Sequence, residues 1–295
     1  MLESIKKIYE KDYKKLLLIP IIVLILALFQ LGYQTATTGD FIIKDITLKG
    51  GIKATVFTED LYDTSILKSD LLNEFENSQI IIKQKTEQYI IDAGISDSHE
   101  IAKFAEIIEN FFHVANDKLN IEVTGSSLGN SFFKDIIKAI IIAFVFMGIV
   151  VFIYFRTLVP SFAIILAAFS DMVVTLAIVN LLGIPLSMGG IIALLLLIGY
   201  SVDTDILLTT RTLKNKDKPV MENVYSALKT GLTMNITTLC AVSVALIFSK
   251  SEVISQIMLI LFIGLFVDML NTWIQNVGIL RLYLENHKNK SKGEF

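Results

Sequence analysis

Four aspartates, Asp171, Asp203, Asp205 and Asp268, interrupt stretches of this sequence that are otherwise strongly hydrophobic. A carboxylate at the centre of a lipid bilayer costs a few kcal/mol, so such residues face protein or water and mark pathways for protons or ions. Carboxylates that are alternately protonated and paired would form a proton or ion relay, whereas carboxylates that only accept hydrogen bonds would hold helices together. We favour the relay for Asp203 and Asp205, and both interpretations stay open for Asp171 and Asp268.

Asp203 and Asp205 cannot serve one site from one helix face. Successive residues of an α-helix are ~100° apart, so these two side chains point ~200° apart. Asp205 shares a stripe with Ser201 and Thr209, whereas Asp203 lies beside Gly199, a small residue that lets a neighbouring helix approach closely. At least one of the two aspartates is therefore expected to face another helix.

Polar residues that could complement these carboxylates lie on two later hydrophobic stretches. Asn271 follows Asp268 by three residues, which is about one helical turn, so both lie on the same face. The stretch before them has a polar N-terminal half, which opens at Lys229 and contains Asn235. This half would complement carboxylates on the helices opposite it.

The composition places the chain in a lipid membrane. Its 295 residues are 53% hydrophobic and 19% charged, with a mean hydropathy of +0.63, whereas soluble domains are about 45–50% apolar and about 25% charged. The net charge of −3 provides no basic field for nucleic acid. The single cysteine, Cys240, cannot form an internal disulfide. Neither metal-ligand spacing nor a serine-nucleophile motif occurs, so we expect no metal, no cofactor and no enzymatic activity.

Six stretches are long and apolar enough to cross the membrane, since a span needs ~20 mainly apolar residues. They are Leu16–Tyr33, Ile136–Phe155, Leu158–Leu182, Leu186–Leu208, Leu232–Phe248 and Val253–Leu280. The first is longer than the core of a signal peptide and lacks a small-residue cleavage site, so we expect it to remain as an anchor. Lysine and arginine are concentrated in the segments on one side, which predicts a multi-pass protein of the cell membrane with both termini in the cytoplasm.

The first two spans are separated by a polar insertion of about 100 residues, 35–134, which the same charge pattern places outside the cytoplasm. Hydrophobic periodicity predicts strand, helix, strand, strand, helix and strand over Ile46–Thr58, Asp63–Asn77, Gln79–Gln84, Gln88–Asp92, Ser98–Asn116 and Asn120–Thr124. This order is the split βαβ arrangement of a ferredoxin-like fold. The predicted fold is a polytopic α-helical membrane protein with six transmembrane helices and one α+β ferredoxin-like extracytoplasmic domain. Its parts are residues 1–34 with the first helix, the insertion 35–134, a five-helix bundle over 135–283 and a cytoplasmic tail over 284–295.

Two adjacent glycines, Gly50 and Gly51, lie in the first predicted strand. They lack the Gly-x-x-x-x-Gly-Lys-Ser/Thr frame of a phosphate-binding loop. Two glycines early in a strand instead indicate a bulge or a close contact with another stretch of backbone.

Four motifs resemble those of one membrane-protein family. They are Asp45–Gly51, Thr124–Gly129 before the second span, Tyr154–Arg156 at the end of that span, and Gly199–Asp205 in the fourth span. Together with the order of the spans and the insertion, they make nearly the whole chain similar to the SecD/SecF family of protein-export membrane proteins, within the resistance-nodulation-division superfamily. The size of the insertion favours the SecF branch, and the motifs look like those of its archaeal members.

The resemblance implies an accessory subunit of the Sec protein-export machinery. Such a subunit acts with SecD beside the Sec translocation channel, within the lipid membrane, and promotes movement of a preprotein. In bacteria the family's cycle is linked to the proton gradient, and carboxylates in the spans are the natural place for that link. The proton-relay candidates are Asp203, Asp205, Asp171, Asp268 and Lys229, of which Lys229 stands where the family has a basic residue at the start of the fifth span. Bacterial relatives read Asn-Asp-Thr where residues 203–205 read Asp-Thr-Asp, so the carboxylate lies one residue to either side of the usual place.

Three other functions share some of these features. A small-molecule or ion exporter of the same superfamily would usually have two external domains and twelve spans in one chain. A structural scaffold of the translocation channel would differ only in that Asp203 and Asp205 do not titrate. An intramembrane aspartyl protease would pair Asp171 with Asp203, but the Gly-x-Gly-Asp motif of those enzymes is missing before Asp203.

Overall fold

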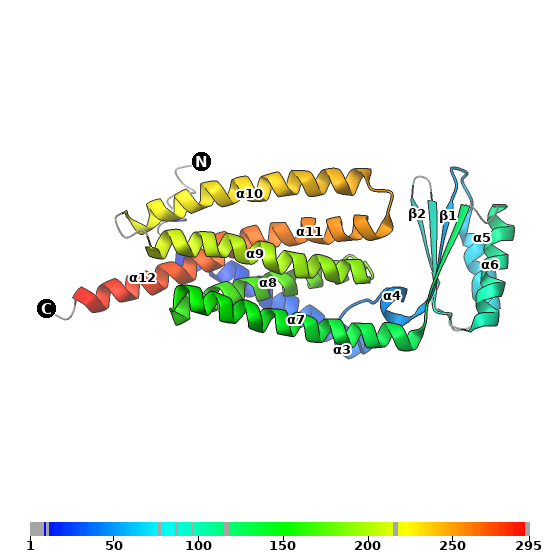
Figure 1. Cartoon of the computed structure of the whole chain (residues 1–295), viewed down its shortest axis with the longest axis horizontal. Coiled ribbons are helices and arrows are strands. Elements are labelled where there is room, and N and C mark those ends of the chain that lie inside the picture. Colours follow the sequence, from blue (N-terminus) through cyan, green and yellow to red (C-terminus); the bar gives the residue numbers. More distant parts are fainter. Residues whose placement is uncertain are drawn as a thin grey trace. The chain divides into compact units, whose positions relative to one another are not determined.

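A computed structural model describes residues 9, 12–75, 78, 80–85, 88–95, 97–114, 118–214 and 218–292 of the chain. Internal contacts divide the chain into two compact units. One consists of Met1–Ile43 and Ala139–Phe295, and the other is Lys44–Lys138. The first unit is a helical bundle, and the second contains the β-sheet (Figure 1).

The prediction of six membrane spans is confirmed by length and composition. The six apolar helical segments are Tyr13–Thr38, Ser131–Phe155, Leu158–Leu181, Met188–Lys214, Val220–Phe248 and Glu252–Asn286. The fifth begins twelve residues before the predicted Leu232, because the polar N-terminal half of that segment is helical too. The sixth extends beyond the predicted Leu280, since the helix continues into the polar segment that follows.

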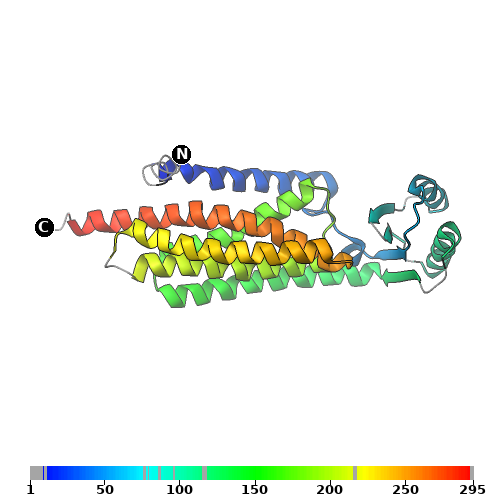
Figure 2. The same ribbon diagram turned by 90° about the horizontal axis from the view of Figure 1, so that it is seen from above.

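The helices of the bundle are α2 (Tyr13–Leu16), α3 (Leu18–Thr38), α7 (Ser126–Phe155), α8 (Leu158–Leu181), α9 (Met188–Lys214), α10 (Val220–Phe248), α11 (Glu252–Leu270), the π-helix η2 (Asn271–Asn276) and α12 (Val277–Lys292). Helix α8 is the most deeply buried of the spans, since 67% of the residues in its most apolar 18-residue stretch are buried, against 6% for α7. Helix α8 contacts α3, α9, α11 and α12, and Figure 2 shows α3 along one side of the bundle. Buried polar side chains such as Asp171 on α8 and Ser201 on α9 are therefore enclosed by other helices of the same chain.

The second unit contains a four-stranded antiparallel sheet and two longer helices. The elements are α4 (Ile46–Lys49), β1 (Gly51–Phe57), α5 (Thr64–Glu74), β2 (Ile80–Lys85), β3 (Gln88–Ala93), α6 (Ser98–Phe112) and β4 (Leu119–Thr124). From β1 onward their order matches the predicted order of strands and helices, and the strands lie in the order β2-β3-β1-β4. Alternate residues Ile52, Ala54 and Val56 of β1 are buried in a core with Phe104 and Ile108 of α6. Helices α5 and α6 cover this face of the sheet (Figure 1).

The predicted start of the first strand at Ile46 is wrong. Residues Ile46–Lys49 form one helical turn, because the Asp45 carboxylate accepts the Ile46 N–H and caps it. Gly50 and Gly51 then reverse the backbone, with φ of 88° and 143°, and the strand begins at Gly51. Positive φ values of this kind favour glycine. Helix and strand therefore meet at the paired glycines.

Of the two alternatives predicted for the paired glycines, a bulge or a close backbone contact, the structure shows the close contact. A Cβ atom on Gly51 would lie 2.5 Å from the carbonyl oxygen of Ala93 on β3. A Cβ atom on Gly129, in the first turn of α7, would lie 2.9 Å from the Gly50 nitrogen and 3.1 Å from the Leu48 carbonyl. The Asp45–Gly51 and Thr124–Gly129 motifs thus pack backbone to backbone, which leaves no room for side chains.

A buried group of charges lies on the sheet beside this contact. Lys53 Nζ is 3.1 Å from Asp45 Oδ2 and 3.7 Å from Asp92 Oδ1, and Lys83 Nζ is 3.5 Å from Asp92 Oδ2. Lys53, Asp45 and Asp92 are all at least nine-tenths buried. Buried charges are tolerated when they are paired, so this group joins the capping residue of α4 to strands β1 and β3.

Candidate functional site

Three of the four membrane aspartates are buried in the interior of the bundle. Asp171 lies on α8, Asp205 on α9 and Asp268 on α11, with exposed fractions of 1%, 0% and 0%. Removing a carboxylate from water requires hydrogen bonds or a counter-charge in return. The donors that surround these three side chains therefore decide what they can do.

Asp171 accepts hydrogen bonds on both oxygens. Asn271 Nδ2 donates to Oδ1 over 2.7 Å, and the Ser201 hydroxyl on α9 donates to Oδ2. Ser201 lies on α9, on the predicted stripe with Asp205, and it contacts Asp171 on α8. The side-chain bonds of Asp171 link α8, α9 and the π-helix.

Asp205 and Asp268 share a donor. The Thr272 Oγ1 atom is 3.0 Å from Asp205 Oδ1 and 3.0 Å from Asp268 Oδ1. Asn276 Nδ2 also donates to Asp205 Oδ1 over 2.7 Å, and Asn235 Nδ2 of α10 donates to Asp268 Oδ2 over 3.2 Å. The predicted complement from the polar half of α10 is therefore provided by Asn235.

A count of protons shows what this arrangement lacks. A threonine hydroxyl carries a single proton, so Thr272 can donate to one of its two carboxylate neighbours at a time. Asp205 Oδ2 is also buried, and it has no hydrogen-bond partner among the residues that the structure describes. No lysine or arginine in the described part of the chain forms an ion pair with Asp171, Asp205 or Asp268. A proton on one carboxyl group would let it donate to Thr272 while Thr272 donates to the other, which satisfies both contacts.

The π-helix η2 carries three of the five side-chain donors to these aspartates. Asn271, Thr272 and Asn276 lie within Asn271–Asn276, where the Val277 N–H reaches back five residues to the Thr272 carbonyl. π-Helices are rare and occur frequently at functional sites, because the wider turn changes the direction in which side chains point. Hydrophobic periodicity does not predict this segment, whose local signal is a cluster of polar residues inside a hydrophobic span.

Two predicted relay residues lie outside this cluster. Asp203 is exposed on α9, on the side of the helix away from Asp205, as their ~200° separation predicts. Lys229 is exposed on α10, where its carbonyl accepts a bond from Thr233. The structure thus brings together Asp171, Asp205 and Asp268 but adds neither Asp203 nor Lys229 to them.

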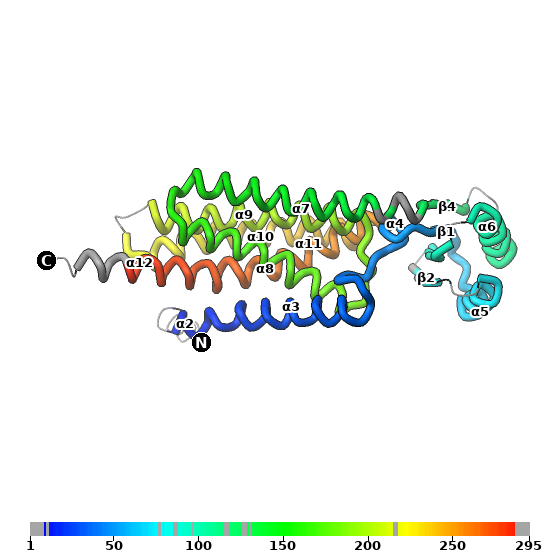
Figure 3. The backbone as a smooth tube through the Cα atoms, turned by 90° about the horizontal axis from the view of Figure 1, so that it is seen from below, coloured from blue at the N-terminus to red at the C-terminus, as the bar shows by residue number. Residues whose placement is uncertain are grey.

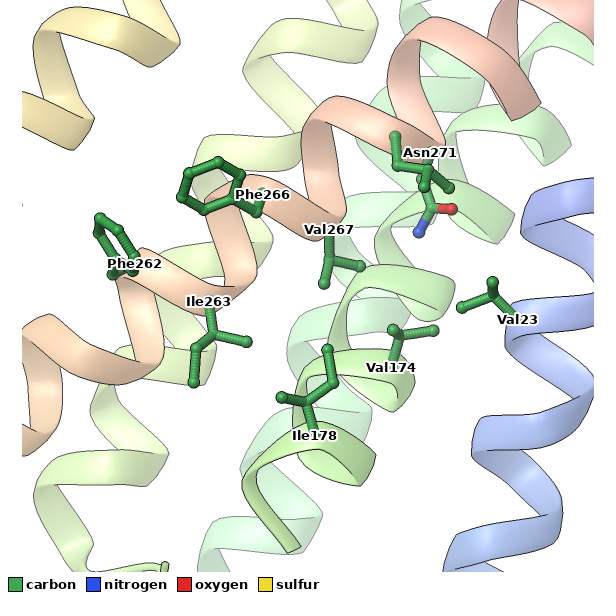
Figure 4. A pocket seen from close by; sticks show the side chains of 9 residues that line it. Val23, Val174, Ile178, Phe262, Ile263, Phe266, Val267 and Asn271 are labelled. Carbon is green, nitrogen blue, oxygen red and sulfur yellow. The ribbon is translucent and has the colours of Figure 1, made fainter. Parts of the chain in front are cut away.

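A groove of about 330 Å³ lies beside the carboxylate cluster. It is lined by residues of α3, α8 and α11, namely Val23, Val174, Ile178, Phe262, Ile263, Phe266, Val267 and Leu270, together with Asn271 (Figure 4). Asn271 is the polar member of this lining, and its amide is already bonded to Asp171. The groove is an apolar surface feature, and the polar chemistry lies behind it in the three-aspartate cluster.

Comparisons with known proteins agree with the motifs. Residues 103–286 match the family model described as protein export membrane protein SecD/SecF, C-terminal. The chain is 40% identical over 288 residues to the protein-export membrane protein SecF of Methanocaldococcus jannaschii, covering 95% of this chain and 99% of that protein. It is 38% identical over 300 residues to SecF of Pyrococcus furiosus, with 98% and 97% covered.

A solved structure has the same fold. The SecDF protein of Thermus thermophilus, described as a translocon-associated membrane protein, superposes with a TM-score of 0.74 at 21% identity. The match covers 94% of this chain and 38% of that protein, so this chain spans well under half of its length. The family resemblance seen in the motifs is thereby confirmed, and the chain belongs to the SecD/SecF family of protein-export membrane proteins.

Proposed function

We propose that this protein is a SecF-type accessory subunit of the Sec protein-export machinery, which works with a SecD partner to promote preprotein translocation. The name shared by the two archaeal relatives supports this function, because each match extends over nearly the whole of both chains. The SecDF structure supports the partner, since this chain accounts for 38% of that protein and leaves the remainder for a second, SecD-like part.

The proposed topology has both termini in the cytoplasm and residues 35–134 outside it as a ferredoxin-like domain. The excess of lysine and arginine in the segments on one side supports the orientation. The strand order β2-β3-β1-β4, with helices between β1 and β2 and between β3 and β4, supports the split βαβ arrangement. The proposed parts remain residues 1–34, 35–134, 135–283 and 284–295.

The proposed coupling is a proton relay through Asp205 and Asp268, with Asp171 as the third carboxylate. The observation that carries it is the position of Thr272 Oγ1, which is equally far from both carboxylates and has one proton for two acceptors. A protonated Asp205 gives its proton to the threonine oxygen while the threonine proton passes to Asp268. The charge then moves from α11 to α9, and the hydrogen bonds that hold these helices together change with it.

Asp203 and Lys229 have a different place in this proposal. Both are exposed on the bundle, on α9 and α10. An ionisable side chain in a membrane span that does not face its own bundle needs a partner or water. We assign these two residues to the surface that meets the SecD partner.

The test compares Asp205→Asn and Asp268→Asn with Asp135→Asn, which changes an exposed carboxylate of α7 outside the cluster, as a control. Asparagine keeps an acceptor oxygen for the existing donors but cannot carry the proton. Preprotein export is measured in inverted vesicles with an imposed proton gradient, and assembly is checked by co-purification of SecD. We expect export to fall at least tenfold for the two buried sites, with assembly intact. Undiminished export in both would assign the protein to the structural scaffold instead.

A further inference from the structure

Tyr9, which precedes the first span in the sequence, contacts the π-helix. The Tyr9 hydroxyl donates a hydrogen bond to the Trp273 carbonyl over 2.7 Å, between residues 264 positions apart in the sequence. Trp273 lies in the middle of η2, directly after Thr272. A backbone carbonyl has two lone pairs, so it can accept this bond in addition to one from its own helix.

Tyr9 is itself held from two directions. Arg281 Nη1 of α12 donates to the Tyr9 carbonyl over 3.0 Å, and the Tyr225 ring of α10 lies with its centroid 6.3 Å from that of Tyr9. Burial raises the pKa of the Tyr9 phenol, and the neighbouring Tyr225 adds to this, so the hydroxyl keeps its proton and remains a donor. Figure 3 shows α2 and α12 at the same end of the bundle.

The indole of Trp273 extends this contact into the bundle. A Cβ atom on Gly231 of α10 would overlap the Trp273 ring, so the ring lies directly on the α10 backbone. Trp273 shares a buried apolar cluster with Leu208 of α9 and Val224 of α10, and Tyr9 packs against the same cluster. The turn that carries the three donors is therefore clamped by Tyr9 on its backbone and by α9 and α10 on its side chain.

A π-helical turn needs such support. Its geometry is less favourable than that of the α-helix, and the segment would gain standard hydrogen bonds by returning to α-helical register. That return would turn Asn271, Thr272 and Asn276 away from their present directions, since the angle between successive residues changes. A hydrogen bond to a carbonyl inside the turn opposes it.

We propose that Tyr9 is a positioning residue, which clamps η2 in π-helical register and thereby aims its side-chain donors at Asp171, Asp205 and Asp268. Its effect on export rests on the proposed relay, whereas its effect on the turn does not. Tyr9, which precedes all six spans in the sequence, thus controls the geometry of a network built from α8, α9 and α11.

The test is Tyr9→Phe with Tyr13→Phe as its matched control. Both remove one phenolic hydroxyl from the same segment, but the Tyr13 hydroxyl donates to Glu285 on α12, whereas the Tyr9 hydroxyl donates to Trp273 of η2. The chain contains a single tryptophan, Trp273, so its fluorescence reports on the turn without labelling. The purified full chain in nanodiscs is examined by this fluorescence and by amide hydrogen exchange of peptides covering residues 271–278.

We expect Tyr9→Phe to shift the Trp273 emission to longer wavelength and to speed exchange at the turn about five- to tenfold, as the loss of one hydrogen bond implies. Tyr13→Phe should leave both unchanged. In export vesicles, Tyr9→Phe should also displace the pH at which export is half-maximal, which a loss of packing alone would not do. Wild-type fluorescence and exchange in Tyr9→Phe would overturn the clamp. An undisplaced pH midpoint would overturn the effect of Tyr9 on export.

Failure of the relay can be told apart from failure of the clamp. If Asp205→Asn and Asp268→Asn export normally, the relay is refuted, and the fluorescence and exchange still decide whether Tyr9 holds the turn. If those variants lose export while Tyr9→Phe matches wild type in every measurement, the relay stands and the clamp is refuted.

Discussion

Replacing Thr272 with valine should weaken the bundle selectively, because it removes one hydroxyl and almost no volume. Both residues are β-branched and of similar size, so the change opens no large cavity. The hydroxyl is 3.0 Å from a carboxylate oxygen of Asp205 and 3.0 Å from one of Asp268, but it has one proton and so makes one donated bond at a time. The perturbation is therefore the loss of one hydrogen bond to a charged acceptor.

The expected loss of stability depends on the hydrogen-bond donors that Asp205 and Asp268 keep without the Thr272 hydroxyl. A hydrogen bond to a charged group contributes about 1.5–3 kcal/mol. Asp205 Oδ1 keeps the Asn276 amide at 2.7 Å, and Asp268 keeps the Asn235 amide on its other oxygen at 3.2 Å. We therefore expect Thr272→Val to lower the free energy of unfolding by about 2 kcal/mol, which is a factor of about 30 in the folded-to-unfolded ratio.

Thr209→Val is the matched control for this change. Thr209 is on α9 and is fully buried like Thr272, but its hydroxyl has no hydrogen-bond partner among the described residues. Removing an unpaired buried hydroxyl should leave stability unchanged or raise it slightly. Unfolding of the purified chain in mixed micelles of increasing SDS fraction, followed by Trp273 fluorescence, gives both values. Equal destabilisation by the two variants, or none by Thr272→Val, would refute the assigned hydrogen bonds.

Two further predictions concern the sheet unit, and hydrogen exchange of peptides from residues 44–138 of the full-length protein measures both. Gly129→Ala should destabilise this unit by about 1–3 kcal/mol, because the new Cβ meets backbone atoms that cannot move aside. Gly125→Ala is the control, since its new Cβ meets open space, and it should change the stability by less than about 0.5 kcal/mol. Equal effects of the two variants would contradict the close contact at Gly129. Lys53→Met should lower the stability of this unit by about 3–5 kcal/mol, because it removes the buried cation that pairs with two carboxylates. Lys103→Met, which breaks an exposed pair, should lower it by at most about 1 kcal/mol. If Lys53→Met leaves the protection of amides from exchange unchanged, the buried charges contribute no net stability.

The strands and helices of the sheet unit could be predicted from local periodicity. Alternation along β1 and helical spacing along Ser98–Phe112 each reflect one face packed on a core, and the core cluster contains the expected apolar residues of both. The exception is Ile46–Lys49, whose apolar residues also fit a strand. There a local hydrogen bond from the Ile46 N–H to Asp45 decides in favour of a helical turn.

Some features of the membrane site follow from the local sequence, and others depend on how the helices pack. Six apolar stretches of sufficient length determine six spans, since no shorter or more polar segment satisfies its backbone groups in lipid. The opposition of Asp203 and Asp205 follows from helix geometry alone, and the buried position of Asp205 and exposed position of Asp203 agree with it. The sequence leaves open which of the two faces the interior.

Only the tertiary structure decided which aspartates meet. Asn271 contacts Asp171 across 100 residues of sequence and Asn276 contacts Asp205 across 71, so no periodicity within one helix contains these pairs. The π-helical register of η2 is also a tertiary outcome, because the α-helical alternative has the better local hydrogen bonds and loses to contacts with Tyr9 and Gly231. Sequence periodicity records which face of an element is buried. The neighbour that buries it depends on how the helices pack, and here that packing unites Asp171, Asp205 and Asp268.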